Sequence, residues 1–464
     1  MVSSLLAFTV CLIAPQAEPQ EAFDARMNRT FQASGVPGAV VRVWKDGKTV
    51  YESSYGVADL DTKVAASQKF AFEIGSLSKQ FVAVCALMLV KEGKLKLDEP
   101  IGQVLDGLPE AWRPATIDQI MHHMSGIPDY EEIAGYDFYN LPRKPEDIIA
   151  EAKKKEPAFK IGDRFEYSNT GYYLISRAVE KRSGLPLAKF MKERLFDPLG
   201  MTSTYTDTRP AGVTPMTGYH SRTGLRVKQP PIAWSSTLGA GGIVSTLDDM
   251  MKWDQALYTD KLLDQTLLSK IWSSTKYNNG QTNNYGYGWI TTAFRGQREL
   301  NHSGQTNGFT CIYRRYPEQK MSVLAFANTY GGNVFGLARA AQIRYIPGLD
   351  YRLLTPATNA DADRTKQHLD YIRRAVFGTG DLSVLAPNVR DLATLDRFAE
   401  TRKQLQEMLG ENPSLEFIRL VKRTAADGSE IEDYLYRHTL PTGKKYWTLG
   451  INKGKVSGLL VEDE

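Results

Sequence analysis

Histidine and cysteine are scarce in this chain, with six histidines and three cysteines among 464 residues. His122 and His123 are adjacent and so point to different sides of a helix, no other histidine lies four residues from either, and H-x-H-x-D does not occur. Zinc and related metals need several such ligands at fixed spacings. The sequence therefore predicts no metal site, and we expect no cofactor.

Long apolar runs are absent after the N-terminus, and no stretch beyond residue 17 is long and apolar enough to be a transmembrane helix. Residues 1–17 contain an apolar core, Leu5–Ala14, which is too short to span a bilayer, and Ala17 is suited to cleavage. These residues predict an export signal, although Lys and Arg are missing before the core. The alternative is a short hydrophobic tail. We expect an exported protein, either periplasmic or secreted.

Two cysteines remain after that segment, and each lies in an apolar pattern. Cys85 stands in VAVCALMLV and Cys311 in FTCIYRRY. We interpret both as core residues rather than as a disulfide or a reactive thiol.

The chain also lacks an excess of either charge. It has 57 Lys and Arg residues against 53 Asp and Glu, a net charge of +4, and its one basic run, Lys153–Lys155, is typical of a solvated helix face. We therefore expect neither a nucleic-acid partner nor a membrane partner. The oligomeric state stays open.

The most distinctive stretch is Phe72–Lys94, in which a Gly-Ser turn precedes ten apolar residues, Phe81–Val90. A helix that is apolar on every side lies in the middle of a domain. Ser76 and Lys79 stand at its start, three residues apart, and so share one face. Burial and the helix N-terminus both disfavour a charged lysine, so we expect a lowered pKa for Lys79. A neutral amine beside a hydroxyl is a general base beside a nucleophile.

The S-x-x-K spacing by itself occurs by chance, and a second copy stands at Ser273–Lys276 in a polar stretch. We interpret that copy as accidental. Two further motifs, Y-x-N and H-x-G, distinguish the first.

The Y-x-N motif is Tyr167-Ser168-Asn169. A tyrosine held against a lysine ammonium has its phenolate form favoured, so that it can shuttle protons. The amide of Asn169 can hold both a substrate carbonyl and the lysine. Alone, such a triplet is more typical of a turn.

The H-x-G motif is His302-Ser303-Gly304, followed by Gln305. The pattern predicts an edge strand whose glycine lets a ligand approach the backbone. A backbone N–H there, with that of Ser76, would form an oxyanion hole. The alternative for a single histidine on a strand is a structural side chain.

In this order the three motifs resemble those of the penicillin-recognising serine hydrolases, which include class C β-lactamases, D,D-carboxypeptidases, D-aminopeptidases and related esterases. HHMSGIPDY is similar to the family's H-T-S-G-L segment, and GAGGIVSTLDDMMKW and YGYGW extend the resemblance over residues 22–348. The resemblance implies an α+β fold of the β-lactamase/transpeptidase type. Its antiparallel sheet is flanked by helices beside an all-helical lobe, with the serine at their junction.

The resemblance also implies roles for the motif residues. Ser76 would be the acylated nucleophile and Lys79 its activating partner. Tyr167 would protonate the leaving group and activate the deacylating water, although which of Lys79 and Tyr167 is the base in each step stays open. The substrate-binding residues would be Asn169, His302, Ser303, Gly304 and Gln305, with the N–H groups of Ser76 and Gln305 forming the oxyanion hole.

The third motif departs from that of class C β-lactamases, which have K-T-G where this chain has HSG. Lysine is charged and suits the carboxylate of β-lactam antibiotics, whereas histidine is largely neutral near pH 7. We therefore favour a D-amino-acid peptidase, a carboxypeptidase or an esterase over a β-lactamase, which remains the alternative. The expected partner is a small molecule or peptide: a D-amino-acid peptide, an ester or a β-lactam.

The remaining sequence predicts a second domain. Residues 349–361 have the composition of a linker. Residues 362–464 predict two helical stretches followed by an antiparallel meander, a small α+β domain. In pattern it resembles cystatin-like or nuclear-transport-factor-like domains, and a spacer, a dimerisation element and an active-site cover are equally open.

Two rival interpretations can be compared with the sequence, an α/β-hydrolase and a family member without catalytic activity. Hydrolysis by the α/β-hydrolase route needs G-x-S-x-G, which the sequence lacks. A catalytically idle family member that binds or self-assembles is the second rival, since mitochondrial relatives form filaments. The presence of all three motifs argues against it, and Ser76→Ala discriminates the two, because only an enzyme loses turnover.

Overall fold

The computed structural model describes residues 18–222, 225–346, 348–358, 360–424 and 429–463. These residues form two compact units, one of residues 24–342 and the other of residues 18–23 with 343–464. The export signal predicted at residues 1–17 lies outside the described residues. None of the described helices has the length and hydropathy of a membrane span.

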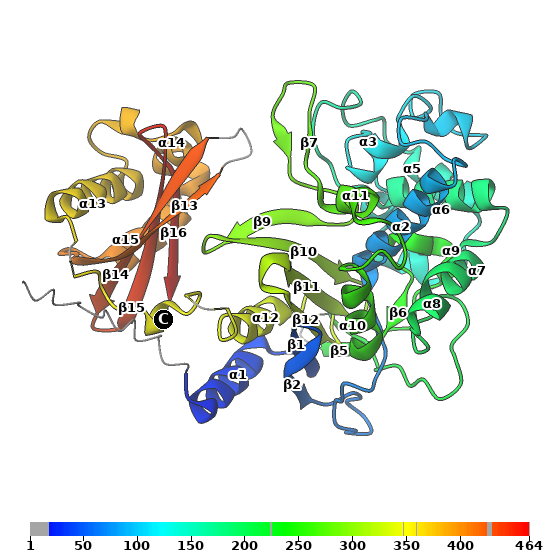
Figure 1. Ribbon diagram of the computed structural model, residues 1–464, viewed down its shortest axis with the longest axis horizontal. Coiled ribbons are helices and arrows are strands. Elements are labelled where there is room, and N and C mark those ends of the chain that lie inside the picture. The colour runs from blue at the N-terminus through cyan, green and yellow to red at the C-terminus, as the bar shows by residue number, and fades with distance from the viewer. Residues whose placement is uncertain (1–17, 223–224, 347, 359, 425–428, 464) are drawn as a thin grey trace, which may run out of the picture. The chain divides into compact units, whose positions relative to one another are not determined.

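The larger unit is built on an antiparallel sheet with the strand order β2-β1-β12-β11-β10-β9 (Figure 1). Two strand-like runs around Asp46-Gly47 predict a hairpin. A hairpin does open the sheet, with Lys45 opposite Lys48 and both turn residues at positive φ. Two-residue hairpin turns favour this conformation because it matches the twist of the strands. The strands are β1 (Gly38–Lys45), β2 (Lys48–Gly56), β9 (Ile290–Phe294), β10 (Gln297–Gln305), β11 (Thr310–Tyr316) and β12 (Met321–Ala327).

Helices cover both faces of this sheet. Arg314 and Arg315 are consecutive on β11 and therefore point to opposite faces. Arg314 donates to the carbonyl of Phe335 in α12 (Val334–Gln342), whereas Arg315 donates to Asp254 in α10 (Leu247–Ala256) at 2.6 Å. Asp254 is buried and also accepts hydrogen bonds from side chains of β1 and β12, so it fixes α10 to the sheet.

The predicted apolar helix is α2 (Ser78–Lys91), whose residues 78–89 are all buried. It packs against α6 (Asn169–Ser183) and α7 (Leu187–Met191) in a helical lobe beside the sheet. The other helices of this lobe are α3 (Ile117–Met121), α4 (Tyr130–Ala134) and α5 (Pro145–Ala152). The predicted fold class, a sheet flanked by helices beside a helical lobe, is confirmed. Cys85 and Cys311 are free and buried, as expected.

Three local predictions differ from the structure. The run IGDRFEYSNTGYY (residues 161–173) predicts a strand that leads into a turn, but no strand forms there, because Ser168 caps α6 by accepting the N–H of Gly171 at 3.2 Å. The helix that Thr116 and Asp118 can cap is expected to end near Ser125-Gly126, but α3 ends at Met121, because His123 adopts a φ of +57°. Strand β10 is an edge strand only in part, since β9 pairs with Gln297–Asn301 and leaves His302–Gln305 bonded to β11 alone.

The smaller unit contains the predicted meander and the first predicted helical stretch, but the second stretch forms two separate α-helices. Its four-stranded antiparallel sheet has the strands in chain order, and residues of its helices and sheet share one hydrophobic core. The helices are α13 (Ala362–Phe377), α14 (Pro387–Thr394) and α15 (Ala399–Leu409), and the strands are β13 (Leu415–Thr424), β14 (Glu430–Leu440), β15 (Gly443–Asn452) and β16 (Lys455–Asp463).

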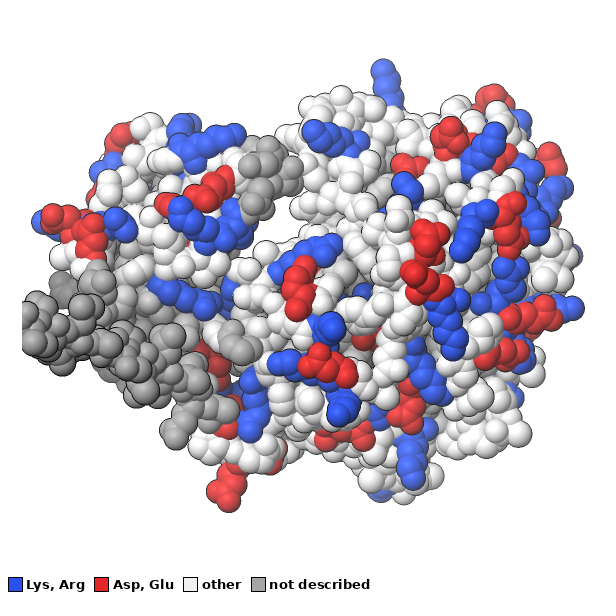
Figure 2. Space-filling view, in the orientation of Figure 1, with Lys and Arg blue, Asp and Glu red and all other residues white. Residues whose placement is uncertain are grey.

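Charged side chains of both signs are interspersed on the face of the larger unit that Figure 2 shows. Several form ion pairs, such as Lys192 with Asp197 at 2.6 Å. Such pairs between exposed residues add little stability, typically about 0–1 kcal/mol. The distribution agrees with the balanced composition of the sequence.

Candidate active site

The first two motif residues meet at the start of the buried helix. Ser76 lies in the short helix η1 (Gly75–Leu77) and Lys79 in the first turn of α2. The Nζ of Lys79 donates to Ser76 Oγ at 3.1 Å and to the carbonyl oxygen of Ala240 at 2.7 Å. Ser76 is half-buried while its chain neighbours are buried, so its hydroxyl lies at the surface of the core. By contrast, Ser273 and Lys276 of the second S-x-x-K copy are exposed.

The pKa of Lys79 is shifted in the expected direction. Burial lowers it from 10.5 to about 8, against the opposing charges of Glu131 and Asp129. A substantial fraction of Lys79 is therefore neutral near pH 8, which a general base toward Ser76 requires.

The Y-x-N motif joins the same cluster through Asn169. Asn169 Oδ1 accepts a hydrogen bond from Lys79 Nζ at 2.6 Å, and its Nδ2 donates to Asp129 Oδ2 at 3.0 Å. Asp129 is buried, and burial raises its pKa. The amide is thus held at both ends, and a contact of Asn169 with substrate stays a prediction.

Tyr167 corrects the expectation of a favoured phenolate. Lys79 Nζ lies over its ring, 4.7 Å from the centroid, rather than in a hydrogen bond with its hydroxyl. Burial raises the pKa of Tyr167 well above 10, and the nearby Ser76 side chain opposes this only in part. The hydroxyl is buried and has no hydrogen-bond partner among the described residues. Tyr167 is therefore a neutral phenol, able to give a proton rather than take one.

His123 contacts the segment Glu166–Ser168 through its backbone and its ring. Its carbonyl accepts the N–H of Glu166 at 3.0 Å, and its Nδ1 accepts that of Ser168 at 3.1 Å. Its ring lies against the ring of Tyr167, with the centroids 4.3 Å apart. Because Nδ1 is an acceptor, the proton is on Nε2, which is buried and has no partner among the described residues.

His302 is also neutral, because it is buried in the folded chain, which the sequence alone does not predict. Its Nδ1 donates to the carbonyl of Ser303 at 2.6 Å, and its Nε2 accepts the hydroxyl of Tyr285 at 2.9 Å. Burial lowers its pKa to about 4, and the charge of Lys79 acts in the same direction. Both ring nitrogens of His302 are therefore engaged in hydrogen bonds, Nε2 with the Tyr285 hydroxyl and Nδ1 with the carbonyl of Ser303.

Two glycines bring the serine segment and β10 together. A side chain at Gly75 would lie 2.5 Å from Gln305 N, and one at Gly304 would lie 2.0 Å from the carbonyl oxygen of Ile74. The backbone N–H groups near Ser76 and at Gln305 are therefore on closely packed segments. Ser303 and Gln305 are half-buried beside them.

Several residues of this cluster carried no assignment from the sequence: Asp129, Glu131, His123, Tyr285 and Ala240. Asp129 and His123 belong to HHMSGIPDY and Tyr285 to YGYGW, both of which contributed to the family resemblance without an assigned role, and Glu131 follows the first of these segments. Ala240 contributes a carbonyl group, which side-chain identity does not predict.

The larger unit is similar in sequence to known proteins. The sequence profile of the family described as Beta-lactamase matches residues 20–346. The chain belongs to this family. A Bacillus subtilis penicillin-binding protein is 29% identical over 301 residues, 61% of this chain, and a D-aminopeptidase of Brucella anthropi is 28% identical over 302 residues, 64% of this chain. The chain spans 66% and 57% of the lengths of these two curated relatives.

The fold is similar to that of solved structures. The D-amino acid amidase of Ochrobactrum anthropi, complexed with D-phenylalanine, superposes with a TM-score of 0.60 and 25% identity, covering 70% of this chain and 97% of that chain. Family, relatives and fold together place the chain in the superfamily of β-lactamases and penicillin-binding proteins.

Proposed function

We propose that this chain hydrolyses D-amino-acid amides, D-amino-acid peptides or small esters through an acyl-enzyme on Ser76. The observation that carries the proposal is the contact between Lys79 Nζ and Ser76 Oγ at 3.1 Å, made by a buried lysine whose pKa is lowered to about 8. A nucleophile within hydrogen-bond reach of a base that is partly neutral near pH 8 is ready for acyl transfer.

In the acylation step, Ser76 Oγ attacks the substrate carbonyl carbon while neutral Lys79 takes the hydroxyl proton. The N–H groups of Ser76 and Gln305 donate to the oxyanion that forms. Collapse of this intermediate breaks the bond to the leaving amine or alkoxide, which receives a proton from the Tyr167 hydroxyl. Water then attacks the ester carbonyl, and the Ser76 oxygen leaves with the proton that Lys79 took during acylation, as the acid product forms.

The state of Tyr167 supports this division of roles. Its raised pKa keeps the Tyr167 hydroxyl protonated, so that it has a proton to give to the leaving group. The lowered pKa of Lys79 makes the lysine, rather than Tyr167, the base of acylation. Once Tyr167 has given its proton, the nearby lysine ammonium stabilises the phenolate, which then takes a proton from the deacylating water.

The third motif favours amide or ester substrates over β-lactams. His302 is neutral, with its pKa near 4, and both its nitrogens are engaged. It therefore offers no positive charge to the carboxylate of a β-lactam. Two relatives with amide substrates in their names, a D-aminopeptidase and a D-amino acid amidase, agree with this choice.

The organisation of the whole chain is part of the proposal. Residues 1–17 would direct export, residues 22–348 would form the hydrolase domain, and residues 349–361 would link it to an add-on domain of residues 362–464. Fractionation of cells that express the full chain and a chain lacking residues 2–17 tests the export step. Loss of the exported form only in the shortened chain supports it.

The test of the activity is intact-mass measurement of the purified protein with a fluorescent penicillin, a panel of D-amino-acid amides and small esters, and a phosphonate probe. Wild type should form a Ser76 adduct with penicillin or phosphonate and hydrolyse at least one amide or ester. Ser76→Ala should do neither while it keeps its fold by circular dichroism.

Other outcomes separate the alternatives. Rapid release of hydrolysed penicillin without an adduct indicates a β-lactamase. Absence of adduct and turnover with every probe contradicts the enzyme function and leaves a non-catalytic binding protein.

A further inference from the structure

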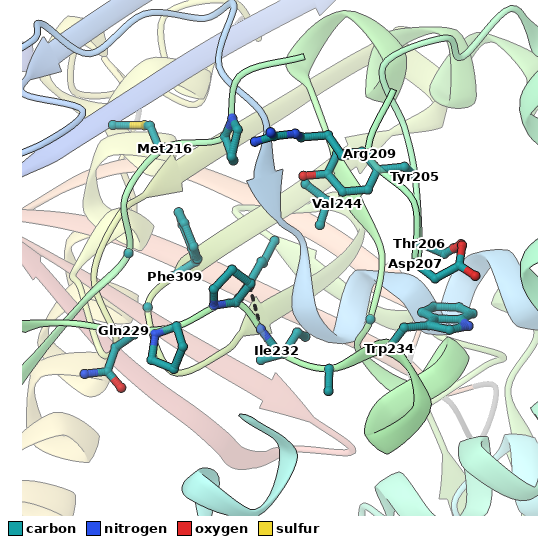
Figure 3. Close-up of a pocket in the computed structure, with 18 of the residues that line it drawn as sticks. Tyr205, Thr206, Asp207, Arg209, Met216, Gln229, Ile232, Trp234, Val244 and Phe309 are labelled. Carbon is teal, nitrogen blue, oxygen red and sulfur yellow. Dashed lines mark hydrogen bonds between the residues drawn. The ribbon is translucent and has the colours of Figure 1, made fainter. Parts of the chain in front are cut away.

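A cavity of about 780 Å³ lies next to the segment that carries the nucleophile (Figure 3). Its wall includes Glu73, three residues before Ser76, and Val244, from the strand β6 (Val244–Ser245) that pairs with β3 (Phe72–Glu73). A cavity of this volume is in the range of small-molecule sites. Ser76 itself does not line it.

The cavity is mostly walled by apolar groups. Figure 3 shows the side chains of Met216, Ile232, Trp234 and Phe309 around it, and prolines 215, 230 and 231 complete this surface. Two charged residues of opposite sign, Asp207 and Arg209, also line it, but both are exposed to solvent. The apolar walls suit an aliphatic or aromatic group.

Glu73 is the exception in this lining, because its carboxyl group is charged in water but only 7% of the residue is exposed. Its Oε1 accepts the N–H of Ile232 at 3.0 Å. Among the residues that the structure describes, no lysine, arginine or histidine forms an ion pair with it. Glu73 is thus a buried acid in a cavity wall, without a cation.

A buried carboxylate without a cation is energetically unfavourable, and proteins usually pair such a group or keep it protonated. Burial does raise the pKa of Glu73. A cation bound in the cavity would reverse this effect, because an opposite charge nearby favours the ionised carboxylate.

We propose that this cavity binds a primary ammonium group on an apolar stem, with Glu73 as its counter-ion. The ammonium donates to the Glu73 carboxylate, and the stem contacts Met216, Trp234 and Phe309. No group given by the three motifs takes part in this recognition.

The position of the cavity also indicates the source of the ammonium, a step that rests on the proposed function. The segment beside the cavity continues toward the nucleophile, since a side chain at Gly241 would lie 3.9 Å from the carbonyl carbon of Gly75. The proposal extends to a substrate that acylates Ser76 and places its side chain in this neighbouring cavity, toward Glu73. Its preferred side chain is a basic one, such as that of D-lysine.

The binding test uses calorimetry of the full chain with n-hexylammonium and with hexanol, which lacks the charge. Hexylammonium should bind wild type, and it should bind Glu73→Gln at least about tenfold more weakly, because the variant lacks the negative charge that pairs with the ammonium. Hexanol should bind the two proteins alike. Glutamine retains an oxygen that accepts the N–H of Ile232, so the variant keeps this contact.

A second pair of variants tests the cavity without altering Glu73. Thr206 is half-buried and lines the cavity, whereas Thr208 is exposed on the same loop and does not line it. Thr206→Trp should weaken hexylammonium binding at least about tenfold, while Thr208→Trp should change it by no more than about twofold, as for a surface substitution. Equal hexylammonium affinity in wild type and Glu73→Gln, or no binding to wild type, overturns the assignment.

Turnover separates this inference from the proposed function. The ratio of kcat/KM for D-lysine amide over D-norleucine amide should be at least about ten in wild type and near one in Glu73→Gln. If neither amide is hydrolysed but hexylammonium binding depends on Glu73, the cavity assignment stands and amidase activity fails. If both are hydrolysed equally and hexylammonium does not bind, the proposed function survives and the cavity assignment is wrong.

Discussion

Asn169 joins Lys79 to Asp129 through the two ends of one amide, with Lys79 Nζ donating to Oδ1 at 2.6 Å and Nδ2 donating to Asp129 at 3.0 Å. The buried acid Asp129 is therefore connected to Ser76 through Asn169 and Lys79. This chain fixes the lysine in position and also adjusts its protonation, because the charge of Asp129 raises the pKa that burial lowers.

The first prediction concerns the pH dependence of acylation. Neutral Lys79 is the active form, and its pKa is about 8, so kcat/KM should rise with pH and level off above pH 8. Lys79→Ala should reduce kcat/KM by about 10²–10⁴-fold, the usual contribution of a general base. Initial rates from pH 5 to 10 measure both effects. A wild-type profile that is flat from pH 6 to 10 would exclude Lys79 as the base.

The second prediction concerns Asp129. Its negative charge favours protonated Lys79, so Asp129→Asn should lower the lysine pKa and shift the rising limb of the profile to lower pH. Asparagine still caps α4, where Asp129 accepts the N–H of Glu131 at 3.0 Å. Glu132→Gln is the matched control, because Glu132 is exposed and pairs with Lys155 at 3.6 Å. If the rising limb of the pH profile of kcat/KM lies at the same pH in Asp129→Asn and in wild type, Asp129 acts only in packing.

The third prediction concerns His123 as a positioning residue for Tyr167. His123→Asn keeps an acceptor that can reach the N–H of Ser168 and tolerates the φ of +57°, but it removes the ring that lies against Tyr167. Deacylation should slow by about 10–100-fold, because small misplacements of a catalytic group cost about this much.

Single-turnover kinetics with an ester substrate checks this result, and circular dichroism confirms the fold. His123→Gly also tolerates the backbone conformation but lacks the acceptor, so its loss should be larger. Wild-type deacylation in His123→Asn would rule out a role for the ring in placing Tyr167.

The fourth prediction concerns the packing of the nucleophile segment on β10. Gly75 has a φ of +52°, and a side chain there would lie 2.5 Å from Gln305 N. Gly75→Ala should lower the free energy of unfolding by about 2–4 kcal/mol, from backbone strain and overpacking together.

Gly93→Ala separates the two contributions. Gly93 has a φ of +68° and no atom within 4 Å of an added side chain, so only strain applies and the loss should be about 1–2 kcal/mol. Urea denaturation measures both. Equal losses at the two positions would mean that contact with Gln305 does not constrain the site.

Local patterns made a large part of the structure predictable. The apolar run Phe81–Val90 predicts α2, and the Asp46-Gly47 turn predicts the β1–β2 hairpin. Ser245 and Thr246 are both suited to cap a helix, which predicts the start of α10, and Thr246 caps it. These features depend on residues close in the sequence. The strand expected at residues 161–173 failed because the capping of α6 by Ser168 outweighed the β propensity of the aromatic residues around it.

The sequence alone determined the family resemblance and the reaction type that we propose, through the order of the motifs that contain Ser76, Lys79, Tyr167 and His302. Only the tertiary structure decided the protonation states and the hydrogen-bond partners of these residues. Burial keeps Tyr167 a neutral phenol and raises the pKa of Glu73. The hydrogen bonds of His302 with Tyr285 and of Asn169 with Asp129 join residues that are far apart in the sequence. Desolvation and pairing set a protonation state, and both arise when distant segments pack together.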